Sequence, residues 1–399
     1  MGKPRPSGRN SGGCGKGSAK EQKLLSRAEG EKMAEAAEGN PEDRDFRILM
    51  DYTHGFMVSQ VLFTASDLGL FDALALGPMD AAAVARALGS SPRGTRLLLE
   101  TCASLGLVQW EDGMGGPTFA LTRLSRLFLL AGSPLSQCSM LRYLAGTTVQ
   151  CWGELGGAVR EGRSQYAQAV GVATWEPFKA IYRCPAPHSG TTPHPGPTPR
   201  SHAERLLFMQ ALQDTWSVYG ERVLTAFDLS EFRVICDIGG GSGALATACA
   251  RLYPTSLVSV FDTPDVVAAA RTHFRPPRGA PPIRFLGGDF FRSRLPSADL
   301  YILARVLHDW TDADAARLLG RIGRAGGRGT ALLLVEAVLT PGGCGPVRTL
   351  LLSLTMLLQT QGRERTEAEY QNMAAAAGFT RCFQCRPTGG DLNVMLTRK

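Results

Sequence analysis

"DIGGGSGALA", residues 237–246, follows a short apolar run and opens a segment with helical spacing. Glycine lets a backbone turn sharply and lets a ligand come close to it. A glycine-rich turn between a strand and a helix is therefore typical of a cofactor site in an α/β fold. This stretch predicts both the fold class and the place where a ligand binds.

The glycine loop fits two fingerprints at once. Gly239, Gly241 and Ala244 satisfy GxGxx[GA], the pattern of dinucleotide-binding folds. Asp237 ahead of the glycines completes DxGxGxG, the loop found in S-adenosylmethionine enzymes. Both fingerprints predict an adenosine-containing cofactor, and the loop alone does not choose between them.

Short apolar runs alternate with helical stretches around this loop. The candidate strands are residues 233–238, 257–262, 283–289, 299–305 and 331–337. Apolar runs joined by crossover helices are typical of a mostly parallel sheet covered on both faces. The final "FTRCFQCRPTGGDLNVMLTR" instead predicts two strands joined by a Gly-Gly hairpin. We therefore expect a Rossmann-like α/β sheet with an antiparallel edge.

Polar side chains stand where three of these strands end. Asp262 lies 23 positions after Gly239, where a carboxylate can bind both ribose hydroxyls of a cofactor. Asp289 and Phe290 follow the third strand and could bond an adenine amino group and pack against its ring. Because parallel strands bring their carboxyl ends to one edge, these residues and Arg305 should meet in one crevice.

The fourth candidate strand ends in "ARVLHDWTD", residues 304–312. His308 is either a polar residue closing a strand, with Trp310 as ordinary core, or a base facing the crevice. Its reference pKa of about 6.5 leaves it largely neutral at pH 7 and able to accept a proton. A base needs an acid on its second ring nitrogen. Asp309, adjacent in sequence, is expected to point away, as a helix cap or a secondary partner.

The amino-terminal half is predicted to be helical. Residues 45–75 have apolar residues at helical spacing, and two short helices and a Gly-rich hairpin follow, which is the outline of a winged helix. Its second helix offers Arg93 and Arg96, but its apolar residues exceed its cations. The pattern therefore favours packing, such as a subunit interface, over DNA binding.

Charge and cysteine usage exclude several classes of protein. The net charge of +7 over 399 residues sits mostly in residues 1–27, where seven basic residues face one acid, so we expect a solvated basic leader. No apolar stretch has the length of a membrane span or a signal peptide, so we expect a cytosolic protein with ten reduced cysteines.

Cys382 and Cys385 form a CxxC without a second pair, which favours a strand over a metal site. Residues 184–200 are proline-rich and predict an exposed loop, in which His188 and His194 are solvated.

Several of these segments together resemble one known family. "DIGGGSGALA", "VFDTPDVV", "GGDFF", "LARVLHDWTD" and "GRERTEAEYQNMAAAAGF" resemble the S-adenosylmethionine-dependent small-molecule O-methyltransferases, over residues 45–399 apart from the 184–200 insert. The resemblance implies a seven-stranded methyltransferase sheet, S-adenosylmethionine as cofactor, and a homodimer formed through the helical domain. Together with the composition of the leader and of the insert, it predicts four parts: a disordered leader (1–44), a winged-helix-like dimerisation domain (45–183), an inserted loop (184–203) and a catalytic domain (204–399).

The same resemblance implies site residues and a reaction. Cofactor-binding positions fall on Tyr166, Trp216, Asp262, Gly288, Asp289, Phe290 and Arg305. The general base falls on His308, and its flanking acids fall on Glu336 and Glu364. "DYTHGFMVSQVLF" and "SQCSMLRYL" resemble members that act on hydroxyindoles, which implies methylation of the 5-hydroxyl of N-acetylserotonin to melatonin. The pocket for the substrate amide keeps Gln359 but has Thr355 where the family has asparagine.

Three other functions stay open from the sequence. A nicotinamide dehydrogenase uses the same glycine loop. A DNA-binding regulator could be built on the winged helix. A family member of impaired activity would result if Thr355 or the proline-rich insert disturbs the site. We expect neither nucleic acid nor membrane as a partner.

Overall fold

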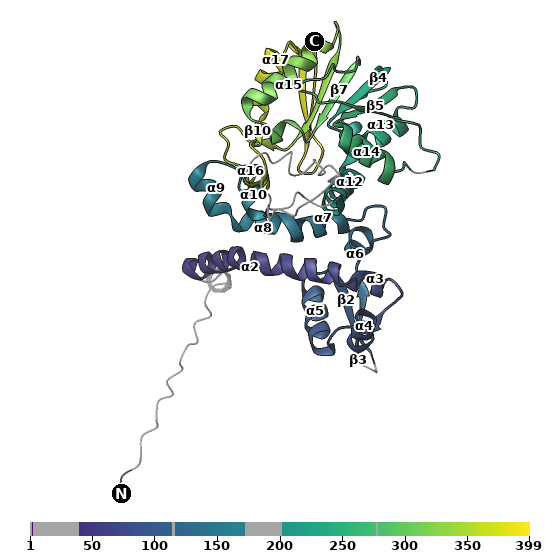
Figure 1. Ribbon diagram of the computed structural model, residues 1–399. Coiled ribbons are helices and arrows are strands. Elements are labelled where there is room, and N and C mark those ends of the chain that lie inside the picture. Colours follow the sequence, from purple (N-terminus) through teal and green to yellow (C-terminus); the bar gives the residue numbers. More distant parts are fainter. Residues whose placement is uncertain (1, 3–39, 114–115, 172–201, 277) are drawn as a thin grey trace, which may run out of the picture. The chain divides into compact units, whose positions relative to one another are not determined.

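The computed structural model describes residue 2 and residues 40–113, 116–171, 202–276 and 278–399 (Figure 1). The chain divides into two compact units, residues 1–60 and 61–399. The expected disordered leader and inserted loop lie almost wholly outside the described residues, as do His188 and His194. Among the helices that are described, none combines the length and the apolar character of a membrane span.

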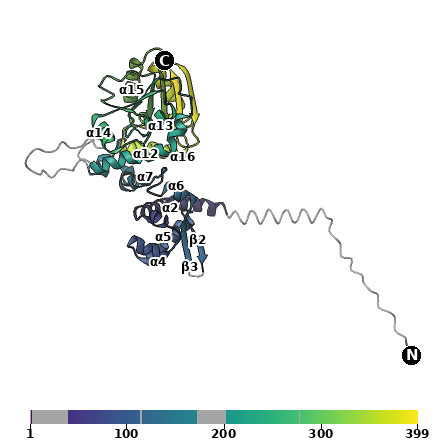
Figure 2. The same ribbon diagram turned by 90° about the vertical axis from the view of Figure 1, so that its right-hand side faces the viewer.

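The amino-terminal elements have the expected winged-helix outline. They are α2 (Pro41–Asp67), α3 (Leu70–Leu74), β1 (Met79–Asp80), α4 (Ala81–Leu88), α5 (Pro92–Ser104), β2 (Val108–Gly113) and β3 (Gly116–Leu121). Asp80 and Ser91 cap α4 and α5 by accepting backbone N–H groups, as short polar residues do at helix starts. The β2–β3 hairpin lies beside α4 and α5 (Figure 2), and β1 adds to β3 as a third strand.

Short helices then lead to the long helix α12. They are α6 (Arg123–Phe128), α7 (Cys138–Tyr143), the π-helix η1 (Leu144–Thr148), α8 (Val149–Gly153), α9 (Leu155–Glu161), α10 (Tyr166–Ala169) and α12 (His202–Leu224). Asp214 of α12 accepts the backbone N–H of Met140, and Gln137 donates to the carbonyl of Asp214. These bonds tie α7 to α12.

A seven-stranded sheet forms the carboxyl-terminal half, as expected. Its strands are β4 (Val234–Ile238), β5 (Leu257–Asp262), β6 (Arg284–Gly287), β7 (Leu300–Ala304), β8 (Ala331–Glu336), β11 (Arg381–Pro387) and β12 (Asn393–Arg398). The order is β11-β12-β8-β7-β4-β5-β6, in which β12 is antiparallel to β8 and β11. The other neighbours are parallel. Cys382 and Cys385 lie in edge strand β11, as the sequence predicts.

Helices cover both faces of this sheet (Figure 1). They are α12, α13 (Ala244–Leu252), α14 (Pro264–His273), α15 (Asp312–Ala325) and α17 (Glu367–Ala376), whereas α16 (Val347–Gln359) contacts α8 and α9. Side chains alternate along each strand, so Ile235 packs with α12 and α13 while Cys236 packs with α15 and α17. Strands buried on both faces read as continuous apolar runs, which is why they are recognisable in the sequence.

A second, two-stranded parallel pairing lies beyond the main sheet. It joins β9 (Val338–Leu339) to β10 (Arg365–Thr366), with Arg365 opposite Val338. Because β9 follows directly on β8 and Glu364 directly precedes β10, this pairing brings Glu336 and Glu364 to the same place. The 3-10 turn η2 (Leu307–Asp309), which carries His308, contacts α16.

Candidate active site

The glycine loop turns from β4 into α13 through residues with positive φ. The N–H of Gly239 donates to the carbonyl of Phe261 on the neighbouring strand, which fixes the start of the turn. Gly243 has φ +79°, and a Cβ there would lie 2.8 Å from the ring of Phe285. Only glycine fits this left-handed position without displacing an aromatic side chain.

Asp262 lies between the glycine loop and the end of β5. One of its carboxylate oxygens accepts the N–H of Gly241 at 2.9 Å, and the other accepts the N–H of Thr263 at 2.7 Å. Burial raises the pKa of Asp262 to about 6, and the two N–H donors oppose this rise. Nearby Asp237 is 1% exposed, and burial together with the charge of Asp262 raises its pKa to about 7.

The loop after β6 approaches the same place. The N–H of Gly288 donates to the carbonyl of Asp262, and a Cβ on Gly288 would lie 2.5 Å from the ring of Phe261. Asp289 accepts the N–H of Phe291, which shapes the following turn. The structure therefore brings the glycine loop, Asp262 and the 288–290 turn together at the carboxyl ends of neighbouring strands.

Phe290 and Arg305 link these strand ends to the histidine turn. The rings of Phe290 and Trp310 pack edge to face with centroids 5.7 Å apart. Arg305 has φ +57°, which is uncommon for a residue with a side chain, and its N–H donates to Val335. This left-handed residue turns the chain from β7 into η2, so it places His308 beyond the sheet edge.

The remaining residues expected in the site come from separate helices. Tyr166 in α10 is fully buried, and Trp216 of α12 packs against the core cluster that contains Leu245 of α13. Gln359 at the end of α16 is buried and accepts the hydroxyl of Tyr143 at 3.2 Å. Thr355, one turn earlier, is half-buried and donates its hydroxyl to Leu351. Their roles toward ligands stay predictions.

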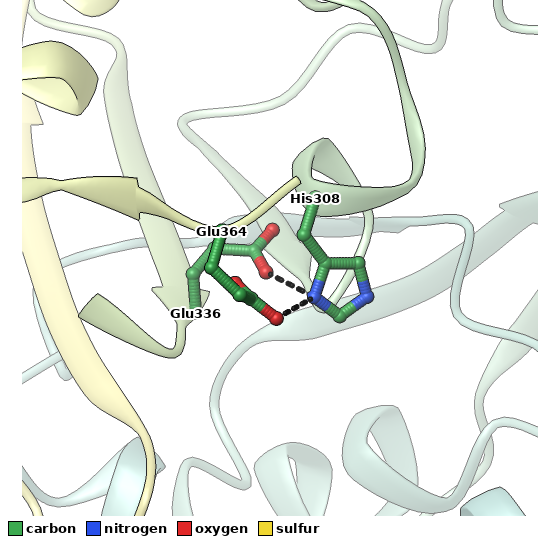
Figure 3. A group of neighbouring side chains, drawn as sticks. All are labelled: His308, Glu336 and Glu364. Carbon is green, nitrogen blue, oxygen red and sulfur yellow. Dashed lines mark hydrogen bonds and ion pairs between the residues drawn. The ribbon is translucent and has the colours of Figure 1, made fainter. Parts of the chain in front are cut away.

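His308 is buried against two carboxylates (Figure 3). Its Nδ1 lies 3.0 Å from Oε1 of Glu364 and 3.2 Å from Oε2 of Glu336, so both acids address the same ring nitrogen. Its Nε2 lies 3.7 Å from Oδ1 of Asp309, which is longer than a hydrogen bond. The two acids therefore pair with Nδ1, which leaves Nε2 as the ring nitrogen that can accept a proton from a substrate.

The charges around His308 change its proton affinity from the value expected of a free side chain. Burial by itself lowers the pKa of His308, but the charges of Glu364, Glu336 and Asp309 outweigh it and raise the pKa to about 9. Burial also raises the pKa of Glu336 to about 7, against the opposing effect of His308. The expectation of a largely neutral imidazole at pH 7 is therefore wrong, because the neighbouring carboxylates stabilise the protonated form of His308.

Asp309 does not cap the following helix. Thr311 is the residue whose side chain accepts the N–H of Asp314 at the start of α15. Asp309 remains in η2 beside His308, and burial raises its pKa to about 6. The alternative of a secondary partner for His308 agrees with the 3.7 Å separation, whereas the alternative of a cap does not.

The same three residues could also hold a cation. His308, Glu336 and Glu364 offer ligand atoms that all lie within 4.8 Å of one another. However, Oε1 of Glu336 already accepts the N–H groups of Val306 and Leu307. Nδ1 of an imidazolium already forms a hydrogen bond with Oε1 of Glu364 and an ion pair with Oε2 of Glu336, so we interpret the cluster as a proton site.

Two residues that the sequence did not single out lie directly against the histidine turn. Arg365 is fully buried and donates to the carbonyls of Leu307 and Trp310. A Cβ on Gly362 would lie 1.9 Å from the carbonyl oxygen of His308. A charged residue inside a two-residue strand gives no periodic signal, although an arginine that is adjacent to an expected catalytic acid could have been noticed.

The sheet, its glycine loop and the histidine held by two acids define a Rossmann-like transferase. A family model described as the O-methyltransferase domain matches residues 152–380, and one described as the O-methyltransferase dimerisation domain matches residues 50–131. The chain belongs to the O-methyltransferase family.

Named relatives extend over most of the chain. The acetylserotonin O-methyltransferase of Mus musculus is 63% identical over 354 residues, which are 87% of either chain. That of Homo sapiens is 49% identical over 363 residues, 90% of this chain and 100% of the human one. The crystal structure of human N-acetylserotonin methyltransferase in complex with SAM superposes with a TM-score of 0.82 at 49% identity. It covers 90% of this chain and 99% of that chain.

Proposed function

We propose that the protein transfers the methyl group of S-adenosylmethionine to the 5-hydroxyl of N-acetylserotonin and so forms melatonin. The observation that carries this proposal is a buried His308 whose Nδ1 faces Glu336 and Glu364, on a turn whose preceding residue, Val306, lies against Gly239 of the glycine loop. The named relatives support the substrate class. A nicotinamide dehydrogenase is disfavoured because no relative reported above is one.

The crevice fits the adenosine half of this cofactor. Side chains are excluded at Gly243 and Gly288, so backbone can approach a ligand there. We propose that Asp262 accepts the ribose hydroxyls, that Asp289 and Phe290 bind the adenine, and that the glycine loop, Tyr166, Trp216 and Arg305 complete the site. A buried oxygen of Asp237 has no hydrogen-bond partner within the described protein, which makes it a further acceptor at the loop.

We propose that His308 takes the proton of the substrate hydroxyl. When bound, S-adenosylmethionine supplies a methyl group that is already activated by its positive sulfur. An aromatic hydroxyl has a pKa of about 10, so only about one molecule in a thousand is ionised at pH 7. His308 can accept that proton at Nε2 while Nδ1–H donates to Glu364 and forms an ion pair with Glu336.

The raised pKa of His308 has two opposing effects on this step. At pH 7, a pKa of about 9 leaves only about one imidazole in a hundred neutral. The same pKa lies about one unit below that of the hydroxyl, so proton transfer is within about 1.4 kcal/mol of balance. The two buried acids therefore make His308 a strong base that is seldom free, and the rate should rise as the pH increases toward 9.

The amide end of the substrate points to a second region of the proposed site. We propose that it lies against α16, near Gln359 and Thr355. Gln359 is held by Tyr143 and by Thr148, which accepts its side-chain N–H at 3.4 Å. Thr355 directs its hydroxyl to its own helix, so it offers less to a substrate amide than the asparagine of the family.

We further propose a cytosolic homodimer that forms through the amino-terminal domain, with the four-part division given above. The matched dimerisation domain supports self-association. Helix α2 carries exposed apolar side chains, among them Phe46, Leu49, Tyr52 and Phe56, and apolar surface of this kind is typical of interfaces. The molar mass in solution, measured by light scattering, tests the dimer.

Calorimetry and a methyl-transfer assay test the proposed activity. S-adenosylmethionine should give binding heat with the full chain, and NAD should give none. Among indoles, catechols and flavonoids, N-acetylserotonin should be methylated fastest. A chelator should not change the rate, because the cluster of His308, Glu336 and Glu364 holds a proton and not a metal. Heat with NAD alone, or transfer confined to catechols, would refute the proposal, and loss of activity in the chelator would favour a metal.

Cofactor affinity should fall as the pH drops through 6. Asp262 binds ribose hydroxyls as a carboxylate, and burial raises its pKa to about 6. Below that pH, binding must release a proton from Asp262, which weakens the complex by up to about tenfold per pH unit. Titrations at pH 5, 6 and 7 in buffers of different ionisation enthalpy measure both effects. Asp262→Asn should bind weakly with no such dependence.

A further inference from the structure

We infer that Arg365 is a positioning residue for His308, because its guanidinium binds the backbone carbonyls on both sides of the histidine and holds the imidazole against its two acids. This inference rests on the proposed function, since it concerns the same proposed base. Arg365 does not reach the reacting atoms, so its effect is exerted through the turn.

Arg365 clamps the histidine turn with three separate donors. Its Nη1 donates to the carbonyl of Leu307 and its Nη2 to that of Trp310, each at 2.8 Å. Its Nε donates to Asp312 in the first turn of α15 at 2.9 Å. The side chain is fully buried, so water does not compete for these bonds. The planar fork of arginine can make all three at once, whereas lysine has a single nitrogen.

The turn is held from its other end by Glu336. One oxygen of Glu336 accepts the N–H groups of Val306 and Leu307, at 3.0 and 2.8 Å. The backbone N–H groups of Val306 and Leu307 therefore donate to the carboxylate of Glu336. The backbone carbonyls of Leu307 and Trp310 accept from the guanidinium of Arg365. Glu336 and Arg365 therefore bind different backbone groups of the turn, and the second oxygen of Glu336 lies 3.2 Å from Nδ1 of His308.

The acid and the clamp are neighbours on one segment. Glu364 contacts Nδ1 of His308 at 3.0 Å, and Arg365 is the next residue. Gly362 packs so closely on the carbonyl of His308 that a Cβ would lie 1.9 Å from it. Pairing of Arg365 with Val338 in turn ties the segment to β9, directly after Glu336. If the turn moves relative to this segment, both carboxylates lose Nδ1 together.

Arg363 provides a matched control for Arg365. It is two residues away, 43% exposed, and pairs with the same Asp312, but it donates to neither carbonyl of the turn. Arg363→Met removes the same charge from the same segment as Arg365→Met does. A role through net charge alone would affect both variants equally, whereas the clamp affects only Arg365.

The experiment compares Arg365→Lys, Arg365→Met and Gly362→Ala with Arg363→Met in the full-length protein. We expect Arg365→Lys and Gly362→Ala to lower kcat about 10- to 100-fold, because displacement of a catalytic group by about 1 Å has effects of this size. The KM for S-adenosylmethionine should stay unchanged, and so should the activity of Arg363→Met.

The titration of His308 gives a readout that does not need turnover. With ¹³C-labelled histidine, the ring signal assigned by its loss in His308→Gln should titrate near 9 in the wild type and at lower pH in the Arg365 and Gly362 variants. If Arg365→Lys keeps both the wild-type kcat and this midpoint, the inference is wrong. A lower melting temperature with an unmoved midpoint would show a purely structural role and also overturn it.

The experiment separates this inference from the proposed function. Full activity of His308→Gln would refute the role of His308 as the base. The midpoint of the His308 titration would still show whether Arg365 positions the ring. If Arg365→Met does not fold, the lysine and Gly362 variants decide. Arg365→Lys retains a buried cation, and Gly362→Ala retains Arg365 itself. If neither variant shifts the midpoint of the His308 titration, the inference is overturned.

Discussion

Replacing His308 by Gln should lower kcat by about 10² to 10⁴, because general-base assistance typically contributes that much to a rate. Glutamine has nearly the same reach but cannot accept a proton near neutral pH. Affinity for S-adenosylmethionine should be retained, since the proposed cofactor residues lie on the glycine loop and the strand ends. Initial rates of melatonin formation and a calorimetric titration measure the two quantities.

His273→Gln is the matched control for this substitution. His273 ends α14, is exposed, and is no part of the cluster around Glu336 and Glu364. It should leave kcat unchanged. Normal turnover by His308→Gln with cofactor still bound would show that the base assignment is wrong. Loss of cofactor binding in that variant would instead indicate a role in shaping the crevice.

Removing both acids should have the second large effect. Glu364→Gln or Glu336→Gln alone leaves one carboxylate within 3.2 Å of Nδ1, so we expect each to lower the plateau value of kcat at high pH about tenfold. The double variant leaves no acid to hold the proton on Nδ1, so its loss should approach that of His308→Gln, on the order of 10² to 10⁴. A double variant no worse than either single one would contradict shared support.

The pH dependence of kcat/KM shows in which direction the acids shift the pKa of His308. The base must be neutral, so kcat/KM should rise with pH and level off near the pKa of about 9 in the free enzyme. Loss of one anion lowers the pKa of His308 toward its ordinary value of about 6.5, so the rising limb should move to lower pH in Glu364→Gln. The plateau should fall at the same time, because a weaker base drives proton transfer less. A limb that stays in place would exclude Glu364 as a partner of His308.

Much of the fold follows from local rules in the sequence. Strands β4, β5 and β7 are apolar because both sheet faces are covered, and glycine is demanded where the backbone turns with positive φ at Gly239 and Gly243. The Gly-Gly hairpin predicts the antiparallel edge correctly. Asp262, Asp289 and Arg305 could be assigned to one crevice because parallel strands share an edge.

The tertiary structure decided how the proposed base works. Glu364 meets His308 from 56 positions away, through the two-residue pairing of β9 with β10, which is too short to show any periodicity. The sequence predicts the helix cap two residues too early, since Asp309 and Thr311 are both capping types and only the geometry distinguishes them.

By itself, the sequence predicted the α/β fold and the glycine loop, and its resemblance to the family placed Glu336 and Glu364 beside His308. Only the tertiary structure decided that both acids face one nitrogen, that they raise the pKa of His308 to about 9, and that Arg365 grips the turn. The physical reason is that strand and turn preferences are local, whereas burial and charge pairing depend on residues that are distant in sequence and adjacent only after folding.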